Sequence, residues 1–307
     1  MHTILGANGL IANGIAKELH SQNQKIRLVS RNPKRIHDSD ELVSADFLNL
    51  EQTMHAVIGS EVVYLTTGLP YKTKVWQEQW PVIMRNVINA SKENGAKLVF
   101  FDNVYSYGLV NGLMTESTPL NPVSKKGEVR AKLCGMLMDE MKNGLPVIIA
   151  RAADFYGSGS PLSFMNELVF KKIAHNEKPM VLVDADKLHS LTYISDAGKA
   201  TAMLGMSEKA WNQVWHVPTA ANPLTTRQII EKASEIAGIS SVKFQLLPKW
   251  LIKTMGLFMP VLAESVEMLY QSEYDYLFDS SKFNNAFHYE PISYGQRINQ
   301  SLYSYEN

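Results

Sequence analysis

The first fourteen residues, Met1-His-Thr-Ile-Leu5-Gly6-Ala-Asn-Gly9-Leu-Ile-Ala12-Asn-Gly14, carry the strongest structural signal in the chain. A short apolar run leads into Gly6-x-x-Gly9-x-x-Ala12, and a helical pattern follows at once. Gly6 permits a tight turn, Gly9 lacks the Cβ that would hold backbone N–H groups away from a pyrophosphate, and Ala12 lets the helix lie close to the strand. The free N–H groups and positive dipole of the helix start attract phosphate. This order predicts a dinucleotide site that includes Gly6, Asn8, Gly9, Leu10 and Ile11.

Composition limits the classes of partner. The 307 residues carry 30 Lys plus Arg and 30 Asp plus Glu, so the formal net charge is zero. The absence of a basic stripe argues against nucleic acid. The most apolar late stretch, 246–263, contains Lys249, Lys253 and two prolines, so we expect a buried or interface helix there and no membrane partner.

Cysteine and histidine usage bears on redox compartment and metals. The single cysteine, Cys134, excludes an internal disulfide and a cysteine metal cluster. The eight histidines lack metal-ligand spacing, so we expect no metal site. No signal-peptide pattern precedes the first strand, and we therefore expect a cytoplasmic protein.

The second predicted strand, 25–30, ends in Ser30-Arg31, where a fold that prefers NAD usually has an acidic residue for the ribose 2′-hydroxyl. A carboxylate would repel a 2′-phosphate, whereas the Arg31 guanidinium can bind one through two hydrogen bonds. The sequence therefore favours NADP(H) over NAD(H). The alternative is a solvated basic loop.

Other predicted strand ends contribute further cofactor contacts, because ligands lie beyond the carboxyl ends of strands in an open parallel sheet. The buried strand 61–68 ends in Thr66-Thr67-Gly68, small residues that let a dinucleotide pass. After the strand that begins at 41, Asp46 is placed to accept a hydrogen bond from an adenine amino group and Phe47 to flank the ring.

Three large aromatic residues, Tyr71, Trp76 and Trp80, follow directly on that ligand-facing strand end. Trp76 and Trp80 are four residues apart and share one face of a helix. The functional interpretation is an aromatic wall for a flat or apolar substrate. The alternative is a helix that packs its aromatics in the core or at a homodimer interface.

Motifs along most of the chain resemble the extended or atypical short-chain dehydrogenases/reductases, in the NAD-dependent epimerase/dehydratase group. The resemblance rests on the glycine motif and on five later segments: Tyr107-Gly108, Glu116 with Pro119, Arg151 to Gly157, Tyr193-Ile-Ser-Asp196, and Trp215-His-Val-Pro. It implies a doubly wound parallel Rossmann sheet with a smaller, discontinuous α/β cap that binds substrate. The implied nucleotide-binding domain is 1–157 and 187–218 with the last helix, 294–303, and the implied cap is 158–186 and 219–290. Within the cap, the pattern predicts a helix over 162–175, a strand over 242–246 and a helix over 261–274.

The catalytic positions depart from that family. Its active Ser or Thr falls on Asn103, and its Tyr-x-x-x-Lys falls on Glu128-Val-Arg-Ala-Lys132, so the tyrosine is missing. The resemblance implies that Lys132 holds the nicotinamide ribose. Glu128 is either a weak base or one half of an i, i+4 ion pair with Lys132, because a glutamate beside a lysine is ionised at neutral pH.

A phenol from elsewhere is the remaining source of a proton. Tyr105, Tyr107 and Tyr156 are the candidates, and the family pattern places Tyr107 best. Tyr107 and Tyr156 are also expected to contact substrate.

Three functions remain open from the sequence. The first is an NADPH-dependent oxidoreductase that acts on a small electrophilic or aromatic substrate without the usual tyrosine. The second is a nucleotide-sugar epimerase or dehydratase, and the third is a non-catalytic NADP(H) sensor. The missing tyrosine favours the first and third.

Overall fold

The computed structural model describes residues 1–160, 163–240 and 243–305. The chain forms two compact units, each assembled from three separate segments. Unit 1 comprises Met1–Ser106, Lys125–Ala152 and Ser195–Val217. Unit 2 comprises Tyr107–Ser124, Ala153–Ile194 and Pro218–Asn307.

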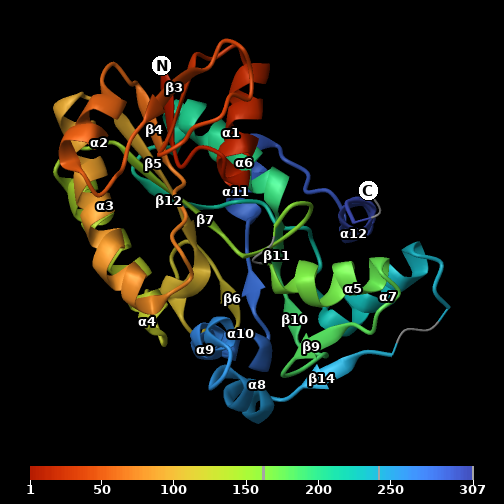
Figure 1. Cartoon of the computed structure of the whole chain (residues 1–307). Helices are drawn as coiled ribbons and strands as arrows, with labels where there is room; N and C mark the ends of the chain where they lie inside the picture. The colour runs from red at the N-terminus through yellow and green to blue at the C-terminus, as the bar shows by residue number, and fades with distance from the viewer. Residues whose placement is uncertain (161–162, 241–242, 306–307) are drawn as a thin grey trace. The chain divides into compact units, whose positions relative to one another are not determined.

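Unit 1 is built on one parallel sheet of seven strands (Figure 1). Its strands are β1 (His2–Leu5), β2 (Ile26–Ser30), β3 (Glu41–Ser44), β4 (Val62–Leu65), β5 (Lys97–Asn103), β7 (Val147–Ala152) and β12 (Gln213–His216). Their order is β12-β7-β5-β4-β1-β2-β3, and every neighbouring pair is parallel. The winding direction reverses next to β1, because β2 lies on one side of it and β4 on the other. Dinucleotides bind at such a reversal point in doubly wound sheets.

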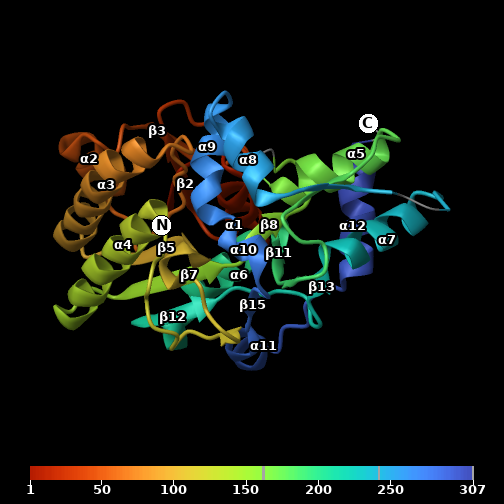
Figure 2. The same cartoon turned by 90° about the horizontal axis from the view of Figure 1, so that it is seen from below.

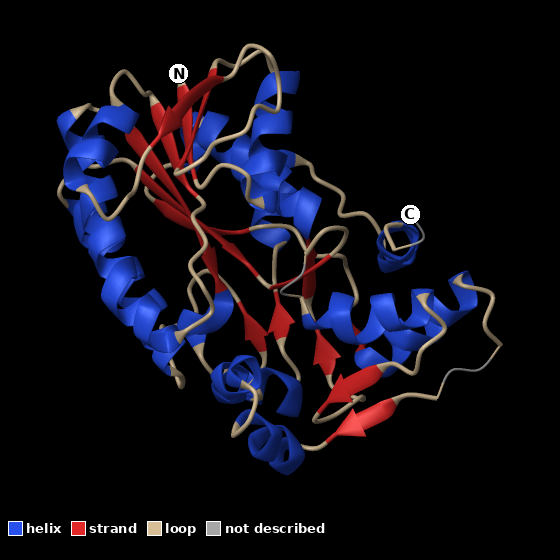
Figure 3. Cartoon of the chain, viewed as in Figure 1, coloured by secondary structure: helices blue, strands red, loops and turns tan. Residues whose placement is uncertain are grey.

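Helices cover both faces of this sheet, as Figure 3 shows in blue and red. They are α1 (Leu10–Ser21), α2 (Leu50–Val57), α3 (Thr73–Glu93), α4 (Lys125–Lys142) and α6 (Ile194–Met206). Helices α2, α3 and α4 lie side by side on one face (Figure 2), and α1 and α6 lie on the other. The contact between α1 and α6 requires glycine, because a Cβ at Gly198 would lie 2.7 Å from the Gly14 Cα. The prediction of a doubly wound α/β fold is confirmed.

The described residues of unit 2 form four separate two-stranded ladders instead of a second large sheet. The pairs are β6 (Leu113–Met114) with β15 (Leu277–Phe278), β8 (Asp154–Tyr156) with β11 (Leu191–Tyr193), β9 (Met180–Leu182) with β14 (Gln245–Leu247), and β10 (Leu188–His189) with β13 (Leu224–Thr225). Its helices are α5 (Lys171–Ala174), α7 (Thr226–Ile236), α8 (Lys249–Gly256), α9 (Pro260–Ser265), α10 (Tyr270–Glu273), α11 (Ser281–Phe287) and α12 (Tyr294–Tyr303).

The last helix packs differently from the arrangement that the sequence implied. Tyr294, Ile298 and Leu302 of α12 are buried in one cluster with Ile229 and Ile230 of α7, so α12 belongs to unit 2. Segment 107–124 also belongs to unit 2, where β6 pairs with β15. The sequence shows that such helices and strands have apolar faces, but it does not show which neighbour covers them.

Three predicted elements of unit 2 have different bounds. The helix expected over 162–175 is a π-helix at Asn166–Phe170 followed by α5, and residue 162 lies outside the described residues. The strand expected over 242–246 is β14, and residue 242 again lies outside them. The helix expected over 261–274 is divided into α9, a 3-10 turn at Val266–Met268, and α10.

Candidate functional site

The glycine turn after β1 has the geometry that a dinucleotide requires. Gly6 has φ +111°, and a Cβ there would lie 2.7 Å from the backbone nitrogen of Thr67, which follows β4. Gly9 precedes α1 in an extended conformation with no side-chain cap. The first N–H groups of a helix lack acceptors within the helix itself, and those of Leu10 and Ile11 are in this position. Ala12 is fully buried, as close packing of α1 on the strand requires.

Two buried hydroxyls at strand ends beside the turn have no hydrogen-bond partner among the described residues. They are Ser30 Oγ, at the end of β2, and Thr67 Oγ1, just beyond β4. An unsatisfied buried hydroxyl costs about 1–3 kcal/mol. The neighbouring Thr66 differs, because its hydroxyl donates to the Leu5 carbonyl over 3.1 Å. The two unpartnered hydroxyls, together with the turn that lacks a Cβ at Gly6 and Gly9, fit a polar ligand laid across β2, β1 and β4.

The two residues predicted to bind adenine make contacts within unit 1. Asp46 Oδ1 accepts from the Leu48 N–H over 3.0 Å, and this turn precedes α2. Phe47 is 6 % exposed, and its carbonyl accepts from Asn86 of α3. Asp46 is exposed, whereas the Phe47 ring lies in the core of unit 1 and has little surface for a ligand.

The aromatic segment after β4 packs mostly inside unit 1. Trp76 and Trp80 are 6 % and 3 % exposed, and their ring centroids lie 6.4 Å apart. Trp76 also contacts Tyr71 edge-on at 5.7 Å and stacks on Tyr105 at 6.3 Å. Tyr71 and Tyr105 are only half-buried, so a substrate surface built from this cluster would consist mainly of those two rings.

Helix α4 turns two cations inward that differ from the Glu128 and Lys132 positions that the sequence suggested. Glu128 and Lys132 are both exposed, whereas Lys126 is fully buried and Arg130 is 5 % exposed. Lys126 Nζ donates to Thr73 Oγ1 over 2.9 Å and lies 4.5 Å from the centre of the Tyr71 ring. The apolar residues of α4 point to the same face, because Leu133 and Leu137 follow Lys126 and Arg130 at seven-residue spacing. The apolar periodicity of α4 was therefore the sequence signal that could have identified Lys126 as an inward-facing residue.

A buried charge cluster fixes α4 to the sheet. Asp102, at the end of β5, is fully buried and binds two guanidinium groups: Arg130 Nε lies 2.8 Å from Oδ1 and Arg151 Nε 3.0 Å from Oδ2. The Cys134 thiol donates to Asp102 and accepts from Arg151. Burial, reinforced by the Asp102 charge, raises the pKa of Cys134 to about 12. Sequence inspection missed this cluster, since its members are far apart in the chain.

Asn103, the residue in the position of the family's active hydroxyl, lies next to that cluster. Its side-chain oxygen accepts from the Tyr105 N–H over 3.1 Å and so caps the 3-10 turn Val104–Tyr107. No hydrogen bond joins Asn103 to Glu128 or Lys132 among the residues that the structure describes.

The two predicted site tyrosines of unit 2 are interior residues. Tyr107 is fully buried and Tyr156 is 1 % exposed. Tyr156 packs on Tyr193 at 5.2 Å and on Tyr294 at 6.0 Å. Its neighbour Gly157, with φ +120°, is held by two hydrogen bonds to the side-chain amide of Asn166, at the start of the π-helix. These contacts make Tyr156 a packing residue of unit 2 in this structure.

Unit 2 also has a polar pair that the sequence did not indicate. His189 Nε2 lies 3.0 Å from Asp154 Oδ2, and both side chains are partly exposed.

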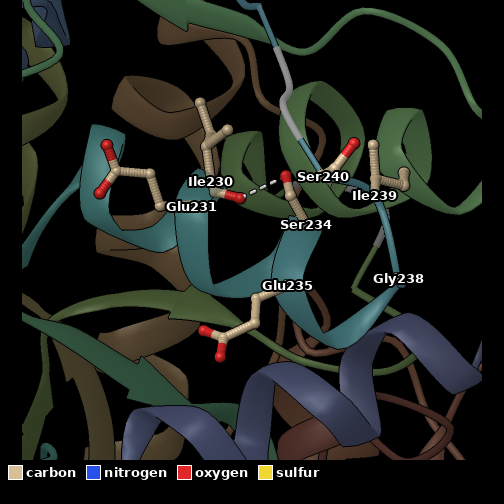
Figure 4. A pocket seen from close by; sticks show the side chains of 7 residues that line it. All are labelled: Ile230, Glu231, Ser234, Glu235, Gly238, Ile239 and Ser240. Carbon is tan, nitrogen blue, oxygen red and sulfur yellow. Dashed lines mark hydrogen bonds between the residues drawn. The ribbon is translucent and has the colours of Figure 1, made fainter.

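A shallow pocket lies elsewhere in the unit, on α7, where Ser234 donates to the Ile230 carbonyl and two glutamates border the opening (Figure 4). It contains none of the predicted residues.

The described part of the chain shows neither a metal-binding cluster nor a membrane-spanning helix. Residues 1–160, 163–240 and 243–305 contain no group of three or more His, Cys, Asp or Glu side chains arranged to hold a metal ion. No helix in the same residues combines the length and apolar character of a membrane span.

Several solved structures are similar to this chain along almost its whole length. The UDP-glucose 4-epimerase of Thermotoga maritima with UDP-glucose has a TM-score of 0.80 at 16% identity, covering 99% of this chain and 98% of that one. The UDP-glucuronic acid 4-epimerase of Bacillus cereus in complex with NAD has a TM-score of 0.79 at 18% identity, covering 99% and 98%. The dTDP-glucose 4,6-dehydratase of Bacillus anthracis in complex with NAD has a TM-score of 0.78 at 17% identity, covering 100% and 96%. At these identities the similarity establishes the fold.

A comparison with curated protein sequences gives no match. The family model for the NAD dependent epimerase/dehydratase family, however, matches residues 2–215, which include the glycine turn and nearly all of unit 1. The chain therefore belongs to the NAD dependent epimerase/dehydratase family.

Proposed function

We propose that unit 1 binds a nicotinamide dinucleotide and that the protein uses it to move hydride to and from a small substrate. The observation that carries this proposal is the turn that lacks a Cβ at Gly6 and Gly9, with the unpartnered hydroxyls of Ser30 and Thr67 on either side of it. A bound nicotinamide dinucleotide supplies the hydride acceptor or donor. The chain supplies the N–H groups of Leu10 and Ile11 for the pyrophosphate and the Thr66–Gly68 segment as the passage beyond β4.

A glycine substitution tests the binding site. Gly9→Ala suits the backbone, with φ −73° and ψ 152°, and its methyl group would meet only the Gly6 carbonyl oxygen, at 3.1 Å. We expect this variant to fold but to lose the thermal stabilisation that dinucleotide gives to the wild type, which is about 2.7 kcal/mol at a hundred times Kd. Gly135→Ala is the control, because nothing lies within 4 Å of its added methyl group on α4. Equal stabilisation of Gly9→Ala and wild type would rule out binding at this turn.

We further propose that the dinucleotide is NADP(H). The support is local: β2 ends at Ser30, Arg31 follows it, neither residue is a carboxylate, and the Arg31 side chain is exposed. Removal of a charged hydrogen-bonding group costs about 1.5–3 kcal/mol, so Arg31→Ala should weaken NADPH binding roughly tenfold or more and leave NADH binding unchanged. Arg85→Ala, at an exposed position of α3, is the matched control. Equal losses for both cofactors would contradict the assignment, and the NAD named with two of the similar structures makes this comparison necessary.

For the substrate, a nucleotide sugar has the broader support. Several of the similar structures are epimerases and dehydratases of nucleotide sugars, and the burial of Trp76 and Trp80 leaves a smaller aromatic wall than the sequence suggested. In this reaction a carbinol carbon gives up hydride and its hydroxyl gives up a proton, and the return of both makes the overall change redox-neutral. The chain must hold that proton, and we assign it to the half-buried phenol of Tyr105.

Reduction of a small electrophilic or aromatic substrate is the second candidate. It is favoured by one observation: the first turn of α4 turns Lys126 and Gly127 inward, and α4 itself contains no tyrosine. Under this proposal NADPH gives up hydride, the electrophile is reduced, and the proton comes from water or Tyr105.

One experiment separates these functions. The protein is incubated with UDP- and dTDP-hexoses and a catalytic amount of dinucleotide, and the sugar ring protons are followed by NMR. In parallel, NADPH absorbance is followed with a panel of carbonyl and quinone compounds. Tyr105→Phe keeps the stacking on Trp76 and removes only the hydroxyl, so it should lose turnover while it retains dinucleotide binding. Binding without turnover in either assay would leave a non-catalytic NADP(H) sensor.

A further inference from the structure

The Asn8 side chain joins the glycine turn to the loop that follows β2. Its Nδ2 donates to the Asn32 carbonyl over 2.8 Å, and its Oδ1 accepts from the Lys34 N–H over 2.9 Å. One primary amide therefore uses both of its ends on the backbone of a segment 24 to 26 residues away. The bonds lie on either side of Pro33, whose ring already restricts the backbone between them.

Ser44 and Asp40 also bind the backbone of the same loop and of the residues that follow it. Ser44 Oγ, at the end of β3, donates to the Arg31 carbonyl over 2.8 Å. Beyond Lys34, the buried Asp40 accepts from the N–H groups of Ile36 and His37, and His20 of α1 lies 2.7 Å from its other oxygen. The backbone around Arg31 is thus fixed before any ligand arrives, while the Arg31 side chain itself extends into solvent.

The backbone of Asn8 is consistent with a specific requirement for its side chain. Asn8 is exposed and has φ +76°, a left-handed conformation that asparagine tolerates better than most residues and glycine best of all. Packing does not demand a side chain at this place. The two hydrogen bonds to the loop are what glycine could not supply.

We infer that Asn8 determines cofactor specificity as a positioning residue: it holds loop 31–34 so that Ser30, Arg31 and Lys34 can donate to a phosphate on the adenine ribose. The inference rests on the proposed NADP(H) binding at this turn. A preordered loop avoids the entropy loss of ordering it on binding, and that gain applies to the ligand that uses the loop. NADP(H) would use it through the 2′-phosphate, whereas NAD(H) lacks this group.

The test is Asn8→Gly, with Asn23→Gly as its matched control. Glycine accepts the left-handed backbone at both positions, and Asn23 has φ +56°, is exposed, and donates no side-chain hydrogen bond in the described structure. Affinities for NADPH and NADH are measured by calorimetry on the full chain. Amide hydrogen exchange at Lys34 is measured on the same samples without ligand.

For Asn8→Gly we expect NADPH affinity to fall roughly 5- to 30-fold, NADH affinity to change less than about twofold, and the Lys34 amide to lose its protection. Asn23→Gly should match wild type in all three. An equal fall for both cofactors, or faster exchange at Lys34 with unchanged NADPH affinity, would overturn the inference. If the wild type binds neither cofactor while Lys34 protection still depends on Asn8, the proposed function fails and the specificity role fails with it, but the contact itself stands.

Discussion

Replacing Asp102 by asparagine should destabilise the protein by about 3–5 kcal/mol. Asp102 is fully buried, and its partners Arg130 and Arg151 are 5 % and 1 % exposed. The two guanidinium groups approach its oxygens at 2.8 and 3.0 Å, so a single carboxylate balances two buried cations. Asparagine keeps the shape of the aspartate side chain and removes its charge. Both guanidinium cations then lack a counterion, and the loss of one partner from a buried ion pair costs about 3–5 kcal/mol.

Urea denaturation followed by tryptophan fluorescence measures this loss, because Trp76 and Trp80 pack around Arg130. Asp139→Asn is the control: Asp139 and its partner Lys142 have side chains 71% and 76% exposed, and such pairs contribute about 0–1 kcal/mol. A loss below about 1 kcal/mol for Asp102→Asn would show that the cluster is not desolvated as the structure indicates.

A double variant distinguishes the cost of an uncompensated buried charge from the cost of a general packing defect. Combining Asp102→Asn with Arg130→Met removes one of the two uncompensated cations and retains an apolar side chain of similar length. The double variant should therefore be more stable than the sum of the single changes predicts, by about 0.5–3 kcal/mol. Strict additivity would mean that Arg130 and Asp102 do not interact energetically.

Three further predictions follow from the same unit. Gly6→Ala should destabilise unit 1 by about 1–3 kcal/mol in urea denaturation, because its methyl group would lie 2.7 Å from the Thr67 nitrogen at a positive φ; unchanged stability would contradict the close approach. The pKa of Cys134 is raised from its ordinary value of 9.0 to about 12, so between these pH values the folded state keeps a proton that the unfolded state releases. Wild-type stability should therefore fall with rising pH in that range, by up to about 1.4 kcal/mol per pH unit more than the stability of Cys134→Ala. Parallel curves of stability against pH for the two proteins would contradict this. Lys126→Met should weaken dinucleotide binding or turnover roughly tenfold, whereas the exposed Lys132→Met should not; the reverse result would support the role that the family resemblance implies for Lys132.

The sequence was sufficient to predict the α/β sheet and the glycine turn because both depend on short-range patterns. Gly6, Gly9 and Ala12 fall within seven residues, and each has a steric reason that holds regardless of the rest of the chain. The buried strand 61–68 is similarly local, since its run of apolar residues ends in Thr66-Thr67-Gly68. The structure confirms the sheet and gives the turn the backbone geometry that the motif demands.

The contacts that define the rest of the candidate site are long-range, and no local pattern encodes them. Asp102, Cys134 and Arg151 come from three separate elements, and their association depends on the parallel pairing of β5 with β7 and on how α4 packs. The same holds for Asn8 and Lys34, which are adjacent only because the turn after β1 lies beside the end of β2.

The phase of a helix decides which charged residues are buried and which are exposed, and on α4 the two positions of the aligned motif are exposed. Matching Glu128 and Lys132 to a Tyr-x-x-x-Lys pattern used spacing alone, and any two residues four apart on a helix satisfy that spacing. The buried apolar positions of α4, Leu133 and Leu137, instead select the face that carries Lys126 and Arg130. A lysine kept fully buried on the inner face has lost its hydration, and a protein bears that cost only where local contacts compensate for it, as Thr73 and Tyr71 do here. Lys126 should therefore be tested first because its side chain is buried, and not because of its spacing from the position at which the family has a tyrosine.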